Sequence, residues 1–177
     1  ASDQVRLSTM DVRGSGSGDL GDVSLMPGVG PVKPMEGTLP DPGSGVYSFF
    51  SHDSGSFRPG YYKVRRDHFG IDVELTDTQR AGFHKYTFPA SDDAKITIDL
   101  TAGIGWDTPR EGYIVKESDT VISGHRYSQG WARDQKVYFT AVFSKPMKGF
   151  QISEITNPRE GVYELREATE VKSRWTF

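Results

Sequence analysis

The stretch Ile71–Thr76 reads IDVELT and alternates strictly between apolar and polar residues. A period of two places Ile71, Val73 and Leu75 on one face of a β-strand and the polar residues on the other. The stretch 95–100, KITIDL, repeats this pattern, so we expect Ile96 and Ile98 to face a core as well. The two segments predict half-buried strands of an antiparallel sheet.

Further strand candidates lie on both sides of these segments, and turn residues separate them. The run Val137–Phe143 is almost continuously apolar, which predicts a central strand buried on both faces, with Val137, Phe139 and Phe143 in the core. Shorter candidates are residues 23–26, 150–153, 162–165 and 171–177. Residues 160–170 form the one segment with a helical pattern.

Composition also favours an all-β chain. Val, Ile, Thr, Phe, Tyr and Trp number 56 of the 177 residues, against 15 for Ala and Leu. The first group suits a pleated, half-buried surface, whereas Ala and Leu favour helices. The 20 glycines and 10 prolines interrupt the chain too often for long helices. We therefore expect an antiparallel two-sheet sandwich that forms a single domain over residues 1–177.

Charge and cysteine content exclude several classes of function. The net charge is -3, with both signs spread along the chain, which argues against nucleic acid and against an anionic membrane as partners. The absence of cysteine excludes disulfides, a thiol nucleophile and Cys-ligated zinc. The four histidines show no metal-binding spacing, so no metal ligand is assigned to this chain.

Four stretches are more specific than a generic β-sandwich requires. They are residues 14–27 (GSGSGDLGDVSLMP), 50–53 (FSHD) with 59–62 (PGYY), 74–76 (ELT) leading to 82–89 (GFHKYTFP), and 143–146 (FSKP). Their order and spacing resemble the N-terminal β-domain of the glycoside hydrolase family 92 α-mannosidases, and the similarity runs through most of residues 3–150.

This resemblance implies an exo-α-mannosidase, of the α-1,2 type, whose N-terminal β-supersandwich of the galactose-mutarotase type packs on an (α/α)6 barrel. Such enzymes use a Ca²⁺ ion at the interface, invert the anomeric centre and carry both catalytic carboxylates on the barrel. The chain is then expected to be an inactive fragment of that N-terminal domain. The expected partners are mannosides or N-glycan mannose and the barrel, the Ca²⁺ ion would be held mainly outside this chain, and the enzyme would be secreted or periplasmic.

The chain itself supplies no candidate catalytic pair. Hydrolysis with inversion needs two carboxylates about 6.5–9.5 Å apart across the sugar. The 24 acidic residues fall mostly in turns and on strand faces, and no pair among them stands out. The family usually has a His-x-His pair before its glycine-rich turn, and Thr9 and Asp11 stand at those positions here.

The candidate substrate-binding residues are Ser15, Gly16, Ser17 and Asp19 in the glycine-rich loop, His52 and Asp53 after a strand, and Trp131 in a loop. Glycine lets the backbone approach a ligand closely, with Asp19 and Asp22 as a polar corner for sugar hydroxyls. An indole can stack on a sugar ring, which makes Trp106 a further candidate.

Each of these residues also has a purely structural interpretation. A Gly/Ser stretch is usually a flexible linker, and Asp53 begins the sequence Asp-Ser-Gly, which is typical of a turn. Most tryptophans of β-sandwiches lie in the core, which is the interpretation preferred for Trp175. His84, among aromatic residues, is interpreted as a packed and hydrogen-bonded residue. The alternative function for the whole chain is a free-standing carbohydrate-binding or structural β-sandwich module.

Overall fold

The computed structural model describes residues 3–4, 22–31, 33, 40–41, 44–46, 48–50, 53, 55–102, 107–157 and 162–174. Its regular elements are β-strands, all paired antiparallel, and these ranges contain no α-helix. The chain divides into two compact units, residues 1–16 with 23–99 and residues 17–22 with 100–177. The all-β, antiparallel fold class predicted from the sequence is thus confirmed. No helix of the described part has the length and apolarity needed to cross a membrane.

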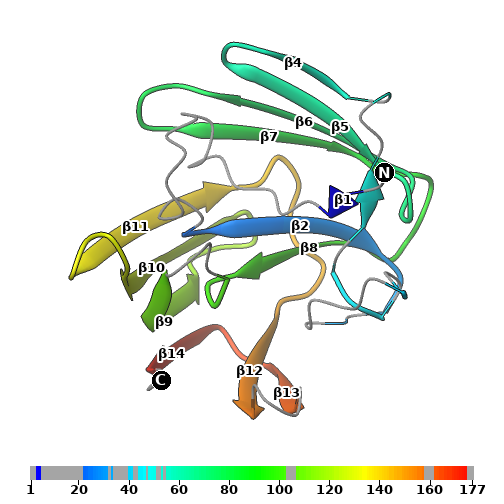
Figure 1. Cartoon of the computed structure of the whole chain (residues 1–177). Coiled ribbons are helices and arrows are strands. Elements are labelled where there is room, and N and C mark those ends of the chain that lie inside the picture. The colour runs from blue at the N-terminus through cyan, green and yellow to red at the C-terminus, as the bar shows by residue number, and fades with distance from the viewer. Residues whose placement is uncertain are drawn as a thin grey trace. The chain divides into compact units, whose positions relative to one another are not determined.

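The first unit contains strands β1 to β8. They are β1 (Asp3–Gln4), β2 (Ser24–Val29), β3 (Phe49–Phe50), β4 (Ser56–Arg58), β5 (Tyr61–Arg66), β6 (Ile71–Asp77), β7 (Gly82–Thr87) and β8 (Ala94–Asp99). Strands β4 to β7 form a four-stranded meander, and β2 pairs with β8 (Figure 1). Strand β1 pairs with β3. Gly60 and Gly70 turn the chain between strands with φ of 75° and 62°, a conformation that glycine adopts without strain.

The core of this unit lies on the face of β6 that the alternating pattern predicts. Ile71 and Val73 are fully buried and Leu75 is nearly so, and they pack with Met26, Phe50 and Val64. Ile96 and Ile98 on β8 are only half-buried, so their prediction as largely buried residues is wrong. Strand β8 has β2 as its one partner among the described residues, and a two-stranded ribbon gives its side chains less cover than a meander does.

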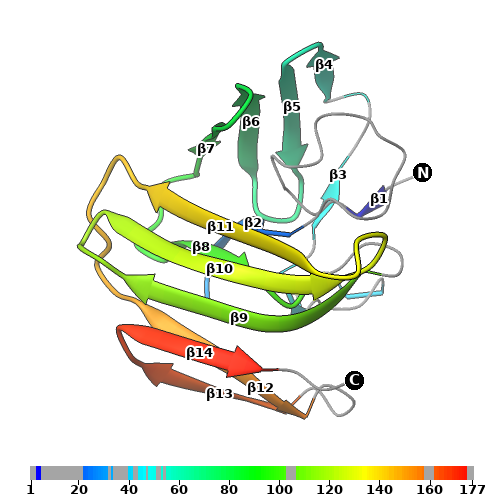
Figure 2. The same cartoon turned by 90° about the vertical axis from the view of Figure 1, so that its left-hand side faces the viewer.

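The second unit contains strands β9 to β14. They are β9 (Thr108–Lys116), β10 (Val121–Gln129), β11 (Gln135–Val142), β12 (Gln151–Asn157), β13 (Val162–Glu167) and β14 (Glu170–Arg174). Figure 2 shows the four-stranded sheet in the order β11-β10-β9-β14, and β12 and β13 form a separate hairpin. The segment predicted as a helix, residues 160–170, instead holds β13 and the start of β14, so that prediction is wrong.

Strand β11 also differs from its prediction as a central strand. It lies at the end of the strand order in the described sheet, and its side chains alternate between half-buried and exposed positions. Tyr138 and Val142 point outward with 67% and 76% of their surface exposed. Val137, Phe139 and Phe143 are half-buried rather than buried. An apolar run does not distinguish a central strand from an edge strand whose outward positions are also apolar.

Candidate functional site

Most of the residues predicted to bind substrate lie outside the described ranges. These are Ser15, Gly16, Ser17, Asp19, His52 and Trp106, and Trp175, which was predicted to lie in the core, is outside the described ranges as well. Asp53 is exposed in the first unit. Trp131 lies in the turn between β10 and β11 of the second unit and is 72% exposed, a position from which an indole can meet a ligand. The substrate-binding assignment therefore stays a prediction.

The described chain resumes after the glycine-rich loop at Asp22, whose side chain is buried. Arg126 on β10 donates from Nη1 to Asp22 Oδ1 at 2.7 Å. Gln135 Nε2, at the start of β11, donates to both carboxylate oxygens at 2.8 Å. The interpretation of Asp22 as a sugar-binding residue is thus wrong, because its oxygens already serve partners inside the protein.

The guanidinium of Arg126 is fully buried and donates four hydrogen bonds, one to each of two carboxylates and two to backbone carbonyl oxygens. Nε donates to Leu100 O at 2.9 Å, and Nη2 donates to Ala102 O at 2.8 Å and to Asp107 Oδ2 at 2.5 Å. The local sequence explains its direction, because Ile122, Arg126 and Ser128 alternate along β10 and are all buried. Arg126 therefore holds Asp22, which ends the glycine-rich loop, together with both flanks of the segment 103–106.

The balance of charge in this cluster is negative, with one guanidinium against two carboxylates. Burial raises the pKa of Asp22 above its ordinary value, and this effect exceeds the opposing effects of Arg126 and Gln135. Asp107 Oδ1 is buried and has no hydrogen-bond partner among the described residues. The cluster can thus accept one more donor, from elsewhere in the chain or from a ligand.

The cluster does not fit a Ca²⁺ ion, which takes 6–8 oxygen ligands. Arg126 already occupies the position between the two carboxylates. In the ranges that the structure describes, no three side chains of His, Cys, Asp or Glu come close enough to hold a metal.

The opposite face of the same sheet carries a group of stacked rings that the sequence analysis missed. His125 on β10 stacks between Tyr113 on β9 and Tyr127, with ring centroids 5.4 and 4.5 Å apart. Its Nε2 lies 3.0 Å from Glu111 Oε1. Tyr127 and Tyr138 share a hydrogen bond of 2.8 Å between their hydroxyls, which raises the pKa of Tyr127 to about 12. In the sequence these aromatic residues occupy outward positions of separate strands. Only the pairing register of β9, β10 and β11 shows that their side chains meet on one face of the sheet.

His84 on β7 behaves as predicted. It is half-buried, its Nδ1 lies 2.6 Å from the Tyr86 hydroxyl, and the two rings pack edge to face. Burial lowers the pKa of His84 to about 4 and raises that of Tyr86. The imidazole is therefore neutral at pH 7, and the hydroxyl donates to it. The interpretation of His84 as a packed, hydrogen-bonded residue is confirmed.

Comparison with solved structures finds α-mannosidases. The family GH92 α-mannosidase BT3965 from Bacteroides thetaiotaomicron, in complex with mannoimidazole, superposes with a TM-score of 0.77 and 32% identity over 90% of this chain. A second structure of the same enzyme gives the same values. The GH92 family glycosyl hydrolase CcMan5 superposes with a TM-score of 0.65 over 88% of this chain, and at 22% identity that likeness concerns the fold.

The chain covers only about a fifth of these relatives, 21% of BT3965 and 20% of CcMan5. No curated protein matches the sequence. A family model, described as the Glycosyl hydrolase family 92 N-terminal domain, matches residues 4–175, which is nearly the whole chain. The match agrees with the family resemblance of the four sequence motifs. The chain therefore belongs to the family of glycosyl hydrolase family 92 N-terminal domains.

Proposed function

We propose that this chain is the non-catalytic N-terminal β-domain of an inverting, Ca²⁺-dependent exo-α-mannosidase that removes α-1,2-linked mannose. The observation that carries the proposal is the 32% identity, over 90% of this chain, with an α-mannosidase that binds mannoimidazole. The small share of the relatives that the chain covers supports a partner domain, which we propose to be an (α/α)6 barrel with the catalytic carboxylates.

The role of this chain would be to supply one wall of the mannose pocket. Support comes from the Arg126 cluster, which uses a buried guanidinium to hold the end of the glycine-rich loop and both flanks of residues 103–106. A pocket wall needs such rigid support, because a misplaced contact group loses most of its effect on the transition state. The proposed contact residues remain Ser15, Gly16, Ser17, Asp19, His52, Asp53 and Trp131.

The remaining parts of the proposal concern the whole enzyme. Its substrates would be mannosides or the mannose of N-glycans, and its location would be secreted or periplasmic. The Ca²⁺ ion would be held mainly outside this chain, which is compatible with the poor fit of the Asp22–Asp107 cluster to calcium.

The test compares the 177-residue chain with the full-length protein on an aryl α-mannoside and on α-1,2-mannobiose. The full-length protein should release β-mannose, as an NMR assay of the fresh product would show. It should lose activity with a chelator and regain it with Ca²⁺, and the chain alone should show no turnover. Turnover by the chain alone would contradict the proposal. A full-length protein that binds mannan without cleaving it would favour the carbohydrate-binding module instead.

A further inference from the structure

A cavity of 150 Å³ lies in the first unit, beside β2 and β8. Residues 26–29 of β2 form one part of its lining. The rest comes from residues 31, 33 and 45–46, from the turn after β5 and from β8. Liquid water occupies about 30 Å³ per molecule, so the cavity has room for about five waters or for one small polyatomic ion with part of its organic group.

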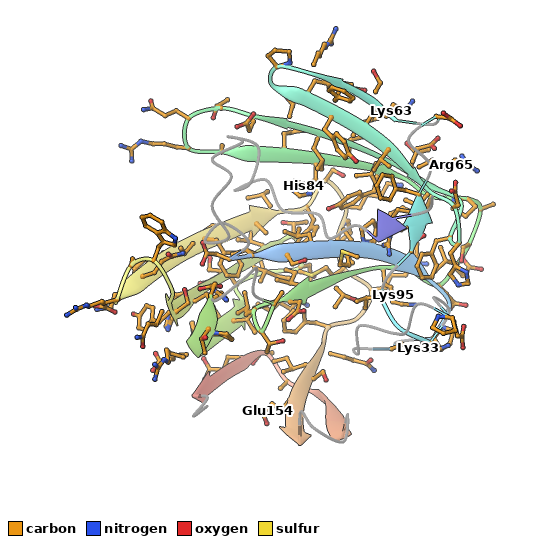
Figure 3. All side chains as sticks on the ribbon, in the orientation of Figure 1. Lys33, Lys63, Arg65, His84, Lys95 and Glu154 are labelled. Carbon is orange, nitrogen blue, oxygen red and sulfur yellow. The ribbon has the colours of Figure 1, made fainter. Side chains whose placement is uncertain are left out.

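The ionisable groups of this cavity are basic. Among its described lining residues they are Lys33, His68 and Lys95, and no carboxylate is among them. Figure 3 labels Lys33 and Lys95 near each other on one side of the first unit, well away from Lys63 on β5. Lys95 is half-buried, and its Nζ donates to Gly30 O. Both lysines belong to the lining, so the ionisable surroundings of the cavity in the described ranges are cationic.

A third cation lies directly behind the cavity wall. Arg66 at the end of β5 is 2% exposed and donates to the carbonyl oxygens of Pro27 and Val46, both of which line the cavity. Its guanidinium also lies 4.8 Å from the ring centroid of Phe69, another lining residue. No carboxylate pairs with Arg66 within the described ranges. Buried charges in proteins are normally paired, so this guanidinium leaves a positive charge at the cavity without a balancing acid.

The titration behaviour agrees with this geometry. Burial lowers the pKa of Arg66 to about 10. Burial also lowers the pKa of Lys95, which Asp93 opposes and the nearby charge of Lys33 reinforces. Both cations would gain from an anion in the cavity, since an anion favours their charged forms.

We propose that this cavity binds a dianionic oxyanion, either phosphate or the phosphate group of a small monoester, held by Lys33 and Lys95 in front of Arg66. A phosphate monoester carries a charge of about -1.5 to -2 at neutral pH, which matches several cations better than a single carboxylate does. Lysine is a common point-charge partner of phosphate. The apolar wall of Met26, Val29 and Phe69 suits the organic part of an ester. This site goes beyond the proposed mannosidase and does not depend on it.

The test follows the backbone amide resonances of Gly28, Val29 and Val46 by NMR in the 177-residue chain. Inorganic phosphate and phenyl phosphate are titrated separately, at constant ionic strength balanced with chloride, because salt screens exposed lysines. Saturable shifts confined to these resonances are the expected result. Tighter binding of phenyl phosphate assigns the site to a monoester, and equal binding assigns it to the inorganic ion.

Three variants make the test specific. Lys33→Gln removes an exposed charge at the cavity and should weaken binding about three- to tenfold, and Lys95→Gln should weaken it about tenfold. Lys33→Arg keeps the charge and should keep the affinity within about twofold. Lys63→Gln, in the same unit but away from the cavity, is the matched control and should bind like the parent chain. The absence of saturable shifts, or equal affinities of Lys33→Gln and Lys63→Gln, would overturn the proposal.

Discussion

Arg126 Nη1 donates to Asp22 Oδ1 across 2.7 Å, although 104 residues separate the two along the chain. Both side chains are buried, and the same guanidinium reaches Asp107. The contact fixes the residue that ends the glycine-rich loop to the middle of a four-stranded sheet. The position of Asp22 therefore depends on a single arginine within β10.

Replacing Arg126 with leucine is expected to lower the free energy of unfolding by about 3–5 kcal/mol, because it leaves two buried carboxylates without their cation. Urea denaturation followed by circular dichroism measures this loss. Arg65→Leu is the matched control, since it breaks an exposed ion pair with Asp72 and should cost less than about 1 kcal/mol. Equal losses for the two variants would contradict the structural role given to Arg126.

Gly124 is predicted to tolerate no side chain. A Cβ atom there would lie 2.2 Å from Tyr113 O and 2.8 Å from the ring of Phe139, and the carbonyl belongs to the paired strand β9. Gly124→Ala should cost about 1–3 kcal/mol of stability or more, as overpacking does. Gly149→Ala has no atom within 4 Å of its new Cβ and should stay within about 0.5 kcal/mol of the parent chain. Thermal unfolding of the two variants measures both changes in stability. A Gly124→Ala variant as stable as the parent chain would show that β9 and β10 are not packed as described.

His84 should make the stability of the chain depend on pH. Its pKa falls from 6.5 to about 4 on folding, so the folded state binds fewer protons between these values. Stability is then fully present above pH 6.5 and decreases as the pH falls toward 4. Because the ring is only half-buried, we expect this loss to be about 1–3 kcal/mol.

The variant His84→Gln isolates this effect. Denaturation curves in phosphate-free buffer at pH 7 and pH 4 should show a smaller pH dependence for His84→Gln than for the parent chain. The exposed His68→Gln should keep the parent's dependence. A parent-like slope in His84→Gln would mean that the imidazole is not held neutral by its surroundings.

The sequence was sufficient for those features that depend on local alternation. The IDVELT pattern predicted β6 and its three buried residues, because one face of that strand packs on the core and the other meets polar surroundings. The same reasoning failed for Val137–Phe143, where Tyr138 and Val142 occupy outward positions of an edge strand in the described sheet. The hydrophobicity of one segment does not determine whether its strand lies in the centre or at the edge of the sheet, because that depends on the strand order.

The residues of the Arg126 cluster could not be predicted from the sequence. Arg126 finds Asp22 and Asp107 only through the tertiary fold, and no spacing rule connects positions 104 and 19 residues apart. An arginine at an inward position of an alternating strand was the one local signal. Arg66 shares this feature, because it is buried at the end of β5 and points at carbonyl groups of distant segments.

The most direct test of the central claim, that this chain forms one wall of a mannose pocket, is the specificity constant of Asp19→Ala in the full-length protein. We expect a decrease in kcat/KM of tenfold or more on α-1,2-mannobiose, since a lost charge-assisted hydrogen bond costs about 1.5–3 kcal/mol. Asp92→Ala, which removes an exposed aspartate from a loop of the first unit, should leave kcat/KM unchanged. An Asp19→Ala enzyme with the kcat/KM of the Asp92→Ala control would contradict the account and identify the glycine-rich loop as a linker.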